Sequence, residues 1–369
     1  MKRRIGALLA AALLGTMLPS ARAAEGTVCV TEAVTGAGSI TLTWTDGGAD
    51  YYEVLRASRE HGAYAVVGTA AQPTYTDTGL QSGQVWFYRV RPCWGQGGDV
   101  RRGPASAPFG QSCVRVVQTP AEQNPCYRQG RTIRVTGLML HSVGCAQEKG
   151  SVFADLWNRP DAEVLVHAVI EPGGTVYQLA DWETRCWHCG GSGNDAMIGV
   201  EMTEPDELCY VSGDRFTWSG SAREKALDNY NTAVALFANL CFRYGLDPMT
   251  GICSHREGAA RGIASGHGDP EHLWQGLGLK LDMDTFRRDV RRMMRGAYRP
   301  RTVEDTAGRL VTVTADVLNV RTGPGTGYAI QGTLRAGETV TVAAYRDTGG
   351  RTWGKLTTGG WICMEYVQG

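Results

Sequence analysis

The stretch Thr132-Ile133-Arg134-Val135-Thr136-Gly137-Leu138-Met139-Leu140-His141 is an apolar run that ends in a histidine. Its composition predicts a buried strand with His141 at the carboxyl end. A second apolar run, residues 163–170, turns at Gly173-Gly174 into residues 175–179, which predicts two further strands.

A helix is predicted farther along, over residues 221–244. Ser221 and Glu224 have the spacing of a capping box, and Gly245 followed by Pro248 stops the helix. One apolar stripe follows its length: Ala226, Tyr230, Ala233, Phe237 and Leu240 or Cys241. Strands mixed with helices predict an α/β domain over residues 132–295, large enough for a core of its own.

The flanking segments have strand periodicity. Residues 27–117 contain short alternating runs separated by glycine turns, which predicts a small antiparallel sandwich. Residues 118–131, with Pro120 and Pro125, and residues 296–309 are predicted linkers, and residues 310–369 return to short strands. We therefore expect a multidomain protein: an α/β core, with a mixed sheet and flanking helices, between two small all-β domains.

The N-terminus predicts export. Lys2-Arg3-Arg4 precedes an apolar run to Leu18, and Ala21-Arg22-Ala23 is a small-x-small cleavage signal, so residues 1–23 are a predicted signal peptide. No later stretch approaches 18 apolar residues, and no stable membrane anchor is expected. The full chain of 369 residues has 37 basic and 37 acidic side chains, which argues against a nucleic-acid partner.

Eleven cysteines follow the predicted signal peptide. An oxidising compartment favours disulfides, but the sequence leaves their connectivity open, and an odd number leaves at least one thiol over. Cys186-Trp187-His188-Cys189 has C-x-x-C spacing. No second such motif accompanies it, so a structural pair is favoured over metal or redox chemistry.

Six of the seven histidines fall within residues 132–295. Histidine is the commonest nitrogen ligand of zinc, and a catalytic zinc needs three protein ligands and an open position. No H-E-x-x-H motif occurs, so the ligands would have to come from separate elements. A histidine at a strand end is also a common hydrogen-bonded structural residue, and spacing alone leaves the zinc site open.

Residues 132–274 resemble a type-2 N-acetylmuramoyl-L-alanine amidase, the fold shared with peptidoglycan recognition proteins. The resemblance rests on strings in the same order and spacing: Leu140-His141-Ser142, Val166-His167-Ala168-Val169-Ile170, Cys186-Trp187-His188-Cys189-Gly190, Ile198-Gly199-Val200-Glu201, Ser254-His255 and His267-Gly268-Asp269-Pro270. It implies Zn²⁺ held by His141, His255 and Asp269. Without it, Asp269 would be interpreted as a turn-starting residue before a proline.

The resemblance also implies two catalytic side chains. Glu201 stands where the family has its general base, and His267 stands where many relatives have a lysine that stabilises the oxyanion. The roles of His167, His188 and Trp187 stay open between cleft contacts and packing. His61 and His272 are interpreted as structural.

The flanks resemble known modules as well. Trp44 and the Leu80-x-x-Gly83 turn are similar to a fibronectin type III module, although Trp86 replaces the usual corner tyrosine. The string Leu318-Asn319-Val320-Arg321-Thr322-Gly323-Pro324-Gly325 resembles a bacterial SH3-like domain, which implies cell-wall binding or tethering.

The expected function is that of a secreted, cell-wall-associated zinc hydrolase of peptidoglycan, which cleaves the amide between N-acetylmuramic acid and L-alanine. The alternative is a non-catalytic peptidoglycan receptor on the same scaffold. Such receptors commonly lose a zinc ligand, whereas all three ligand positions and Glu201 are present in this chain. A phage-type endolysin shares the chemistry, and the predicted signal peptide favours an exported cellular enzyme instead.

Overall fold

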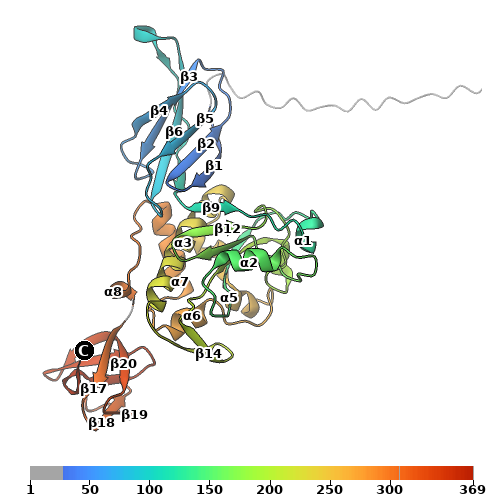
Figure 1. The fold of residues 1–369 in the computed structure, drawn as a ribbon. Helices are drawn as coiled ribbons and strands as arrows, with labels where there is room; N and C mark the ends of the chain where they lie inside the picture. Colours follow the sequence, from blue (N-terminus) through green and yellow to red (C-terminus); the bar gives the residue numbers. More distant parts are fainter. Residues whose placement is uncertain (1–27, 307, 369) are drawn as a thin grey trace, which may run out of the picture.

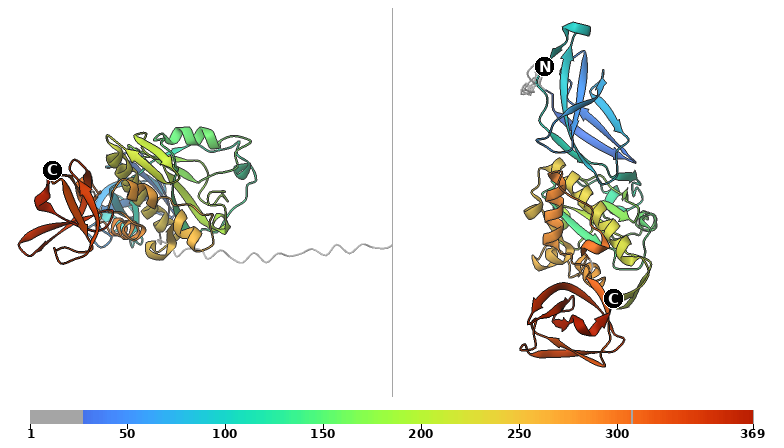
Figure 2. Two further views of the ribbon diagram at one scale, coloured as in Figure 1. Left: turned by 90° about the horizontal axis from the view of Figure 1, so that it is seen from below. Right: turned by 90° about the vertical axis from the view of Figure 1, so that its left-hand side faces the viewer.

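The computed structural model describes residues 28–306 and 308–368, which form three successive units in a row (Figure 1 and the right-hand view of Figure 2). The predicted signal peptide lies outside the described residues. Within these two ranges, no helix has the length and apolarity needed to cross a membrane. The expected arrangement, an α/β core between two all-β units, is confirmed.

The N-terminal unit is a sandwich of two sheets. One has the strand order β1-β2-β5, and the other has the order β4-β3-β6-β7 with β8 also paired to β6. The strands are β1 (Val30–Gly36), β2 (Ser39–Trp44), β3 (Tyr51–Ala57), β4 (Ala65–Ala70), β5 (Thr74–Thr78), β6 (Val85–Trp94), β7 (Arg101–Arg102) and β8 (Phe109–Ser112). Alternation explains the packing, because Ile40, Leu42 and Trp44 of β2 point inward and are buried.

The central unit is built on a mixed six-stranded sheet. Its strand order is β16-β10-β13-β11-β12-β9, and only the pair β11–β12, joined at Gly173-Gly174, is antiparallel. The strands are β9 (Arg115–Gln118), β10 (Gly137–Ser142), β11 (Ala168–Glu171), β12 (Thr175–Gln178), β13 (Met197–Met202) and β16 (Ile252–Ser254). A separate hairpin, β14 (Leu208–Ser212) and β15 (Arg215–Trp218), follows β13.

Helices cover this sheet and complete the core. They are α1 (Pro125–Arg128), α2 (Gly150–Trp157), α3 (Ala222–Tyr244), α4 (Pro248–Gly251), α5 (His255–Ala260), α6 (Glu271–Gly276) and α7 (Met283–Met294). The predicted stripe of α3 is buried, and the Tyr230 ring lies 5.6 Å from that of Trp274 and 5.5 Å from that of Phe286. The long helix α3 therefore joins α6 and α7 to the sheet.

The predicted capping box at the start of α3 is wrong. Ser221 has a near-helical backbone (φ −95°, ψ 22°) and caps no backbone N–H; its hydroxyl donates to Glu207 Oε1 at 2.9 Å instead. A capping box does begin α5, where Ser254 Oγ accepts from the N–H of Glu257 at 3.0 Å and Glu257 Oε2 accepts from the N–H of Ser254 at 3.3 Å.

The sandwich is joined to the central unit along a broad contact. Strand β9 lies beyond the sandwich and pairs in parallel with β12, although residues 115–117 were expected in the sandwich and Gln118 in a linker. Ser112 donates from its N–H to Asn239 Oδ1 (2.7 Å) and from its hydroxyl to the Ala235 carbonyl (2.8 Å). A Cβ on Gly110 would lie 2.4 Å from the Phe242 ring, so the two units approach closely.

The C-terminal unit, shown in Figure 2, is one antiparallel sheet with the order β19-β18-β22-β21-β20-β17-β23. Its buried side chains form a small apolar core. Its elements are β17 (Arg309–Val313), β18 (Val317–Arg321), β19 (Ile330–Arg335), β20 (Thr339–Thr348), β21 (Arg351–Leu356), β22 (Trp361–Cys363) and β23 (Val367–Gln368). The expected linker before it is partly ordered. It contains α8 (Val303–Thr306), and the N–H of Arg301 donates to Asn231 Oδ1 at 2.8 Å.

The expected disulfides are absent, because all eleven cysteines, each within the described ranges, are free thiols. Cys186 and Cys189 do not pair with each other since their side chains are buried in two different apolar clusters. Burial raises the pKa of both thiols. The two cysteines of the C-x-x-C motif therefore pack separately in this structure, each in its own apolar cluster.

Candidate active site

The candidate site lies at the carboxyl edge of the central sheet. His141 of β10 and Glu201 of β13 are register partners in parallel strands, so their side chains share one face. His255 begins α5 directly after β16, and Asp269 precedes α6. The N–H of Arg256 donates to the Asp269 carbonyl at 3.2 Å, which holds this loop against α5. Residues far apart in the sequence thus meet where open α/β sheets usually bind ligands.

The three predicted ligands converge on one point. His141 Nδ1 lies 3.1 Å from His255 Nδ1 and 3.3 Å from Asp269 Oδ2, and His255 Nδ1 lies 3.5 Å from Asp269 Oδ1. All three residues are buried, and their ligand atoms lie within 4.8 Å of one another. Tetrahedral ligands with bonds of about 2.0–2.2 Å are about 3.3–3.6 Å apart. The donor set and its spacing therefore fit a divalent ion.

Neighbouring groups fix the position of His255. The hydroxyl of Ser254 donates to Glu271 Oε1 at 2.7 Å, while Arg287 of α7 contacts Glu257 and donates to the Ile252 carbonyl at 3.0 Å. Helices α6 and α7 thereby hold the start of α5. The ring of His255 also contacts Ser265 Oγ through Nε2 at 3.2 Å, which leaves its Nδ1 facing His141 and Asp269.

The ionisable groups of the site perturb one another. Burial lowers the pKa of His141. Burial alone would raise the pKa of Asp269, but hydrogen bonds and charge from His141 and His255 outweigh it and bring the pKa below its ordinary value. The Asp269 carboxylate is therefore ionised, which is the protonation state in which it binds metal.

Glu201 lies beside this cluster, and its pKa is shifted in the opposite direction to that of Asp269. Burial raises the pKa of its carboxyl well above the ordinary value, and the charges of Asp269 and Glu204 add to the rise. Its Oε2 is buried and has no hydrogen-bond partner among the described residues. A carboxyl group with a raised pKa and an unpaired oxygen is suited to accept and return a proton.

The remaining histidines separate into distinct environments. The His267 side chain is 62% exposed, with its ring centroid 4.5 Å from that of His255 and its Nδ1 4.0 Å from Asp269 Oδ1. His188 Nδ1 lies 3.0 Å from His141 Nε2. Among the described residues, the His167 ring hydrogen-bonds with backbone groups, namely the Gly199 N–H at 3.0 Å and the Thr184 carbonyl at 2.8 Å. The structure thus brings His188 to the ligand cluster and leaves His167 outside it.

A second buried cluster, centred on Glu204, escaped the sequence analysis. Glu204 Oε1 accepts from Ser142 Oγ at 2.7 Å and from the Gly144 N–H at 3.1 Å, and it lies 3.3 Å from His272 Nε2. Tyr210 of β14 also donates to this carboxylate. Glu204 lies three residues after Glu201, just past the end of β13. This position beside the site was the only indication in the sequence, and it becomes visible only once the end of the strand is known.

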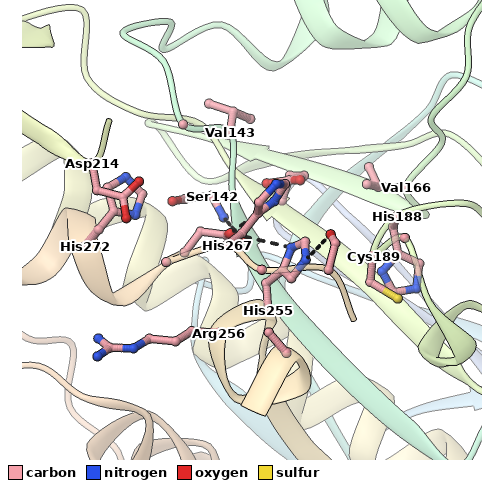
Figure 3. A pocket seen from close by; sticks show the side chains of 18 of the residues that line it. Ser142, Val143, Val166, His188, Cys189, Asp214, His255, Arg256, His267 and His272 are labelled. Atoms are coloured by element: carbon pink, nitrogen blue, oxygen red, sulfur yellow. Dashed lines mark hydrogen bonds and ion pairs between the residues drawn. The ribbon is translucent and has the colours of Figure 1, made fainter. Parts of the chain in front are cut away.

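A cavity of about 1310 Å³ opens over these residues. Figure 3 shows Val166 and His188 on one side of His255, and Asp214, His272 and Arg256 on the other. The lining of the cavity also includes the apolar residues Trp157, Val164 and Trp187. It further includes the polar residues Arg215 and Gln275.

Two family models match the sequence. Residues 131–272 match N-acetylmuramoyl-L-alanine amidase, and residues 316–368 match the bacterial SH3 domain. No curated protein matches the chain.

Several solved structures are similar to parts of this chain. The Staphylococcus aureus hydrolase AmiA, solved with its ligand, is 18% identical (TM-score 0.39), with 51% of this chain and 88% of AmiA covered. A mutant Bacillus subtilis endolysin is 17% identical (TM-score 0.34; 48% and 99% covered). An Fn3-like protein from Clostridium thermocellum is 25% identical (TM-score 0.21; 23% and 91% covered). On the two sequence-model matches, the chain contains a domain of the N-acetylmuramoyl-L-alanine amidase family followed by a bacterial SH3 domain.

Proposed function

We propose that this protein is an exported, zinc-dependent peptidoglycan amidase that cleaves the bond between the lactyl group of N-acetylmuramic acid and L-alanine. One observation carries the proposal: two imidazole nitrogens and a carboxylate lie 3.1–3.5 Å apart, beside a buried glutamate with an unpaired oxygen. The amidase family match supports the reaction class.

His141, His255 and Asp269 would hold the ion. Two neutral imidazoles and one carboxylate are a donor set typical of catalytic zinc sites, and they leave one net positive charge and an open position. When bound, zinc supplies a Lewis acid that activates water and polarises the amide carbonyl.

Glu201 and His267 would supply the proton and the hydrogen bond. The carboxylate of Glu201 accepts the proton that the attacking water loses and returns it to the nitrogen of the leaving L-alanine. His267, exposed in the cavity beside His255, donates a hydrogen bond to the negative oxygen that develops on the carbonyl.

The two sides of the cavity favour one orientation of the substrate. Trp187, which is 40% exposed, and Trp157 offer flat apolar faces suited to sugar rings. Arg256, which lies on the other side of His255 from His188 in Figure 3, and Arg215, which follows Asp214 in the sequence, suit the carboxylates of a stem peptide. We therefore place the glycan near Trp187 and the peptide near Arg256.

The SH3 domain would hold the enzyme on the wall. Tethering to an insoluble polymer raises the effective concentration of substrate, so a modest affinity is enough. Export, through the predicted signal peptide, places the protein where peptidoglycan is accessible; neither a nucleic-acid partner nor a stable membrane anchor belongs to this proposal.

The test uses the full mature chain and a purified disaccharide-peptide, with products identified by mass spectrometry. We expect free stem peptide with an N-terminal L-alanine, loss of product in the presence of a chelator, and recovery on adding Zn²⁺. Bound but intact substrate would favour the receptor instead. Cleavage between sugars or within the peptide would overturn the assigned bond.

A further inference from the structure

A chain of hydrogen bonds leads from the backbone to a predicted zinc ligand. His188 Nε2 lies 3.1 Å from the Met197 carbonyl oxygen, and His188 Nδ1 lies 3.0 Å from His141 Nε2. His141 Nδ1 in turn faces His255 and Asp269. All of these imidazole rings are buried, so water does not replace any link.

The first link fixes the protons along the chain. A backbone carbonyl only accepts, so His188 must carry its proton on Nε2. A neutral His188 then accepts at Nδ1, and the proton in that bond belongs to His141 Nε2. His141 is left with its lone pair on Nδ1, the atom that points at His255 and Asp269.

The ring of His188 is also held mechanically. It lies against Gly199 of β13, where an added Cβ would come within 2.4 Å of the His188 ring. Its backbone N–H donates to Asn194 Oδ1 at 2.8 Å. Both contacts fix the ring plane that meets His141, and they give a physical reason for glycine in the string Ile198-Gly199-Val200-Glu201.

We infer that His188 is a positioning residue: it selects the tautomer of His141 that presents Nδ1 to the ion, and it fixes the orientation of that ring. The inference rests on the proposed function, because it presumes that the ion binds. Partners that orient a ligating histidine in this way are worth about 10–100-fold in metal affinity.

His167 provides a matched control within the same core. It is as deeply buried as His188, its ring centroid lies 5.9 Å from that of His188, and it also makes two hydrogen bonds. Both of its partners are backbone groups, and neither belongs to a ligand. A purely structural role for His188 predicts that the two residues respond alike.

The experiment measures Zn²⁺ affinity of the full mature chain by competition with a chromophoric chelator, together with the visible spectrum of the Co²⁺-loaded protein. We expect H188L to weaken Zn²⁺ binding about 10–100-fold and to alter the Co²⁺ spectrum. H167L should keep wild-type affinity and spectrum, whatever its loss of thermal stability. H188N, whose side-chain oxygen can still accept from His141, should recover most of the affinity and covers the case in which H188L does not fold.

Three results would overturn the inference. Wild-type affinity in H188L, equal weakening in H167L, or no recovery in a folded H188N would each reduce His188 to a packing residue. A wild-type chain that binds no ion would overturn the proposed function as well, which distinguishes the two failures.

Discussion

The ligand cluster (His141, His255, Asp269) and the Glu204 cluster (Glu204, Tyr210, His272) are made of similar residue types at one edge of one sheet. In the Glu204 cluster the carboxylate accepts from Ser142, Gly144 and Tyr210, so it is saturated. In the ligand cluster the two Nδ1 atoms face a shared carboxylate, and the neighbouring Glu201 keeps an unpaired oxygen. Among the described residues, the two clusters therefore differ in their carboxyl groups: Glu204 is surrounded by donors, whereas Glu201 keeps an unpaired oxygen beside the three predicted ligands, and His272 Nδ1 is the unpaired atom of the Glu204 cluster.

The largest expected effect separates the two glutamates. E201Q should lower amidase turnover by about 10²–10⁴-fold, because the amide cannot accept a proton from water. It should retain stoichiometric Zn²⁺, since Glu201 is not among the predicted ligands. Turnover and metal content are measured on the same preparation. Equal losses of turnover in E201Q and E204Q would erase the distinction between the clusters.

For the free energy of unfolding, E204Q should have the larger effect and E201Q the smaller one. E204Q should lower the free energy of unfolding by about 1–3 kcal/mol, because a buried carboxylate with several donors is replaced by an amide that cannot accept them all. E201Q should lower the free energy of unfolding by less than E204Q does, or should raise it. The substitution removes a buried carboxyl group whose Oε2 has no hydrogen-bond partner among the described residues. Denaturant titration of the metal-free proteins measures both. A more stable E204Q would contradict the structural role of Glu204.

The exposed histidine of the site should act as a hydrogen-bond donor. H267A should lower amidase turnover by about 10²–10³-fold, because the negative oxygen that develops on the carbonyl then loses a donor. H61A changes the same residue type on the distant sandwich, where the His61 side chain is 86% exposed, and should leave turnover unchanged. Wild-type turnover in H267A would remove His267 from the mechanism.

The smallest expected effect is on the pH dependence of stability, and it comes from the Glu204 cluster alone. Burial by itself would lower the pKa of His272, but the hydrogen bond and charge of Glu204 outweigh it and raise the pKa above its ordinary value. The pair therefore stabilises the fold fully below the unfolded-state pKa of about 6.5, and this contribution is lost as pH rises through the raised pKa. Metal-free wild type should lose stability over that range relative to H272Q. A constant difference would mean that His272 does not titrate there.

Much of the architecture could be predicted from the sequence because local patterns set it. The apolar residues before His141, the stripe of α3 and the glycine turns each specify an element without help from distant residues, although the strand that contains His141 begins at Gly137 and not at Thr132. The strand β9 was assigned to the wrong unit, because its pairing with β12 is decided by a partner some 60 positions away. The capping box at Ser221 failed for a similar reason, since Glu207 offers its hydroxyl an acceptor from another segment.

The sequence by itself was enough to predict which side chains carry the chemistry: the resemblance implies His141, His255, Asp269, Glu201 and His267. Only the tertiary structure decided how His167 and His188 differ, because two buried histidines are chemically identical until their neighbours assign their protons. The same holds for Glu201 and Glu204, three residues apart, of which one is saturated with donors and the other is not. Hydrogen-bond partners and solvent exclusion are properties of the folded arrangement, and they set tautomers and pKa values that no linear pattern encodes.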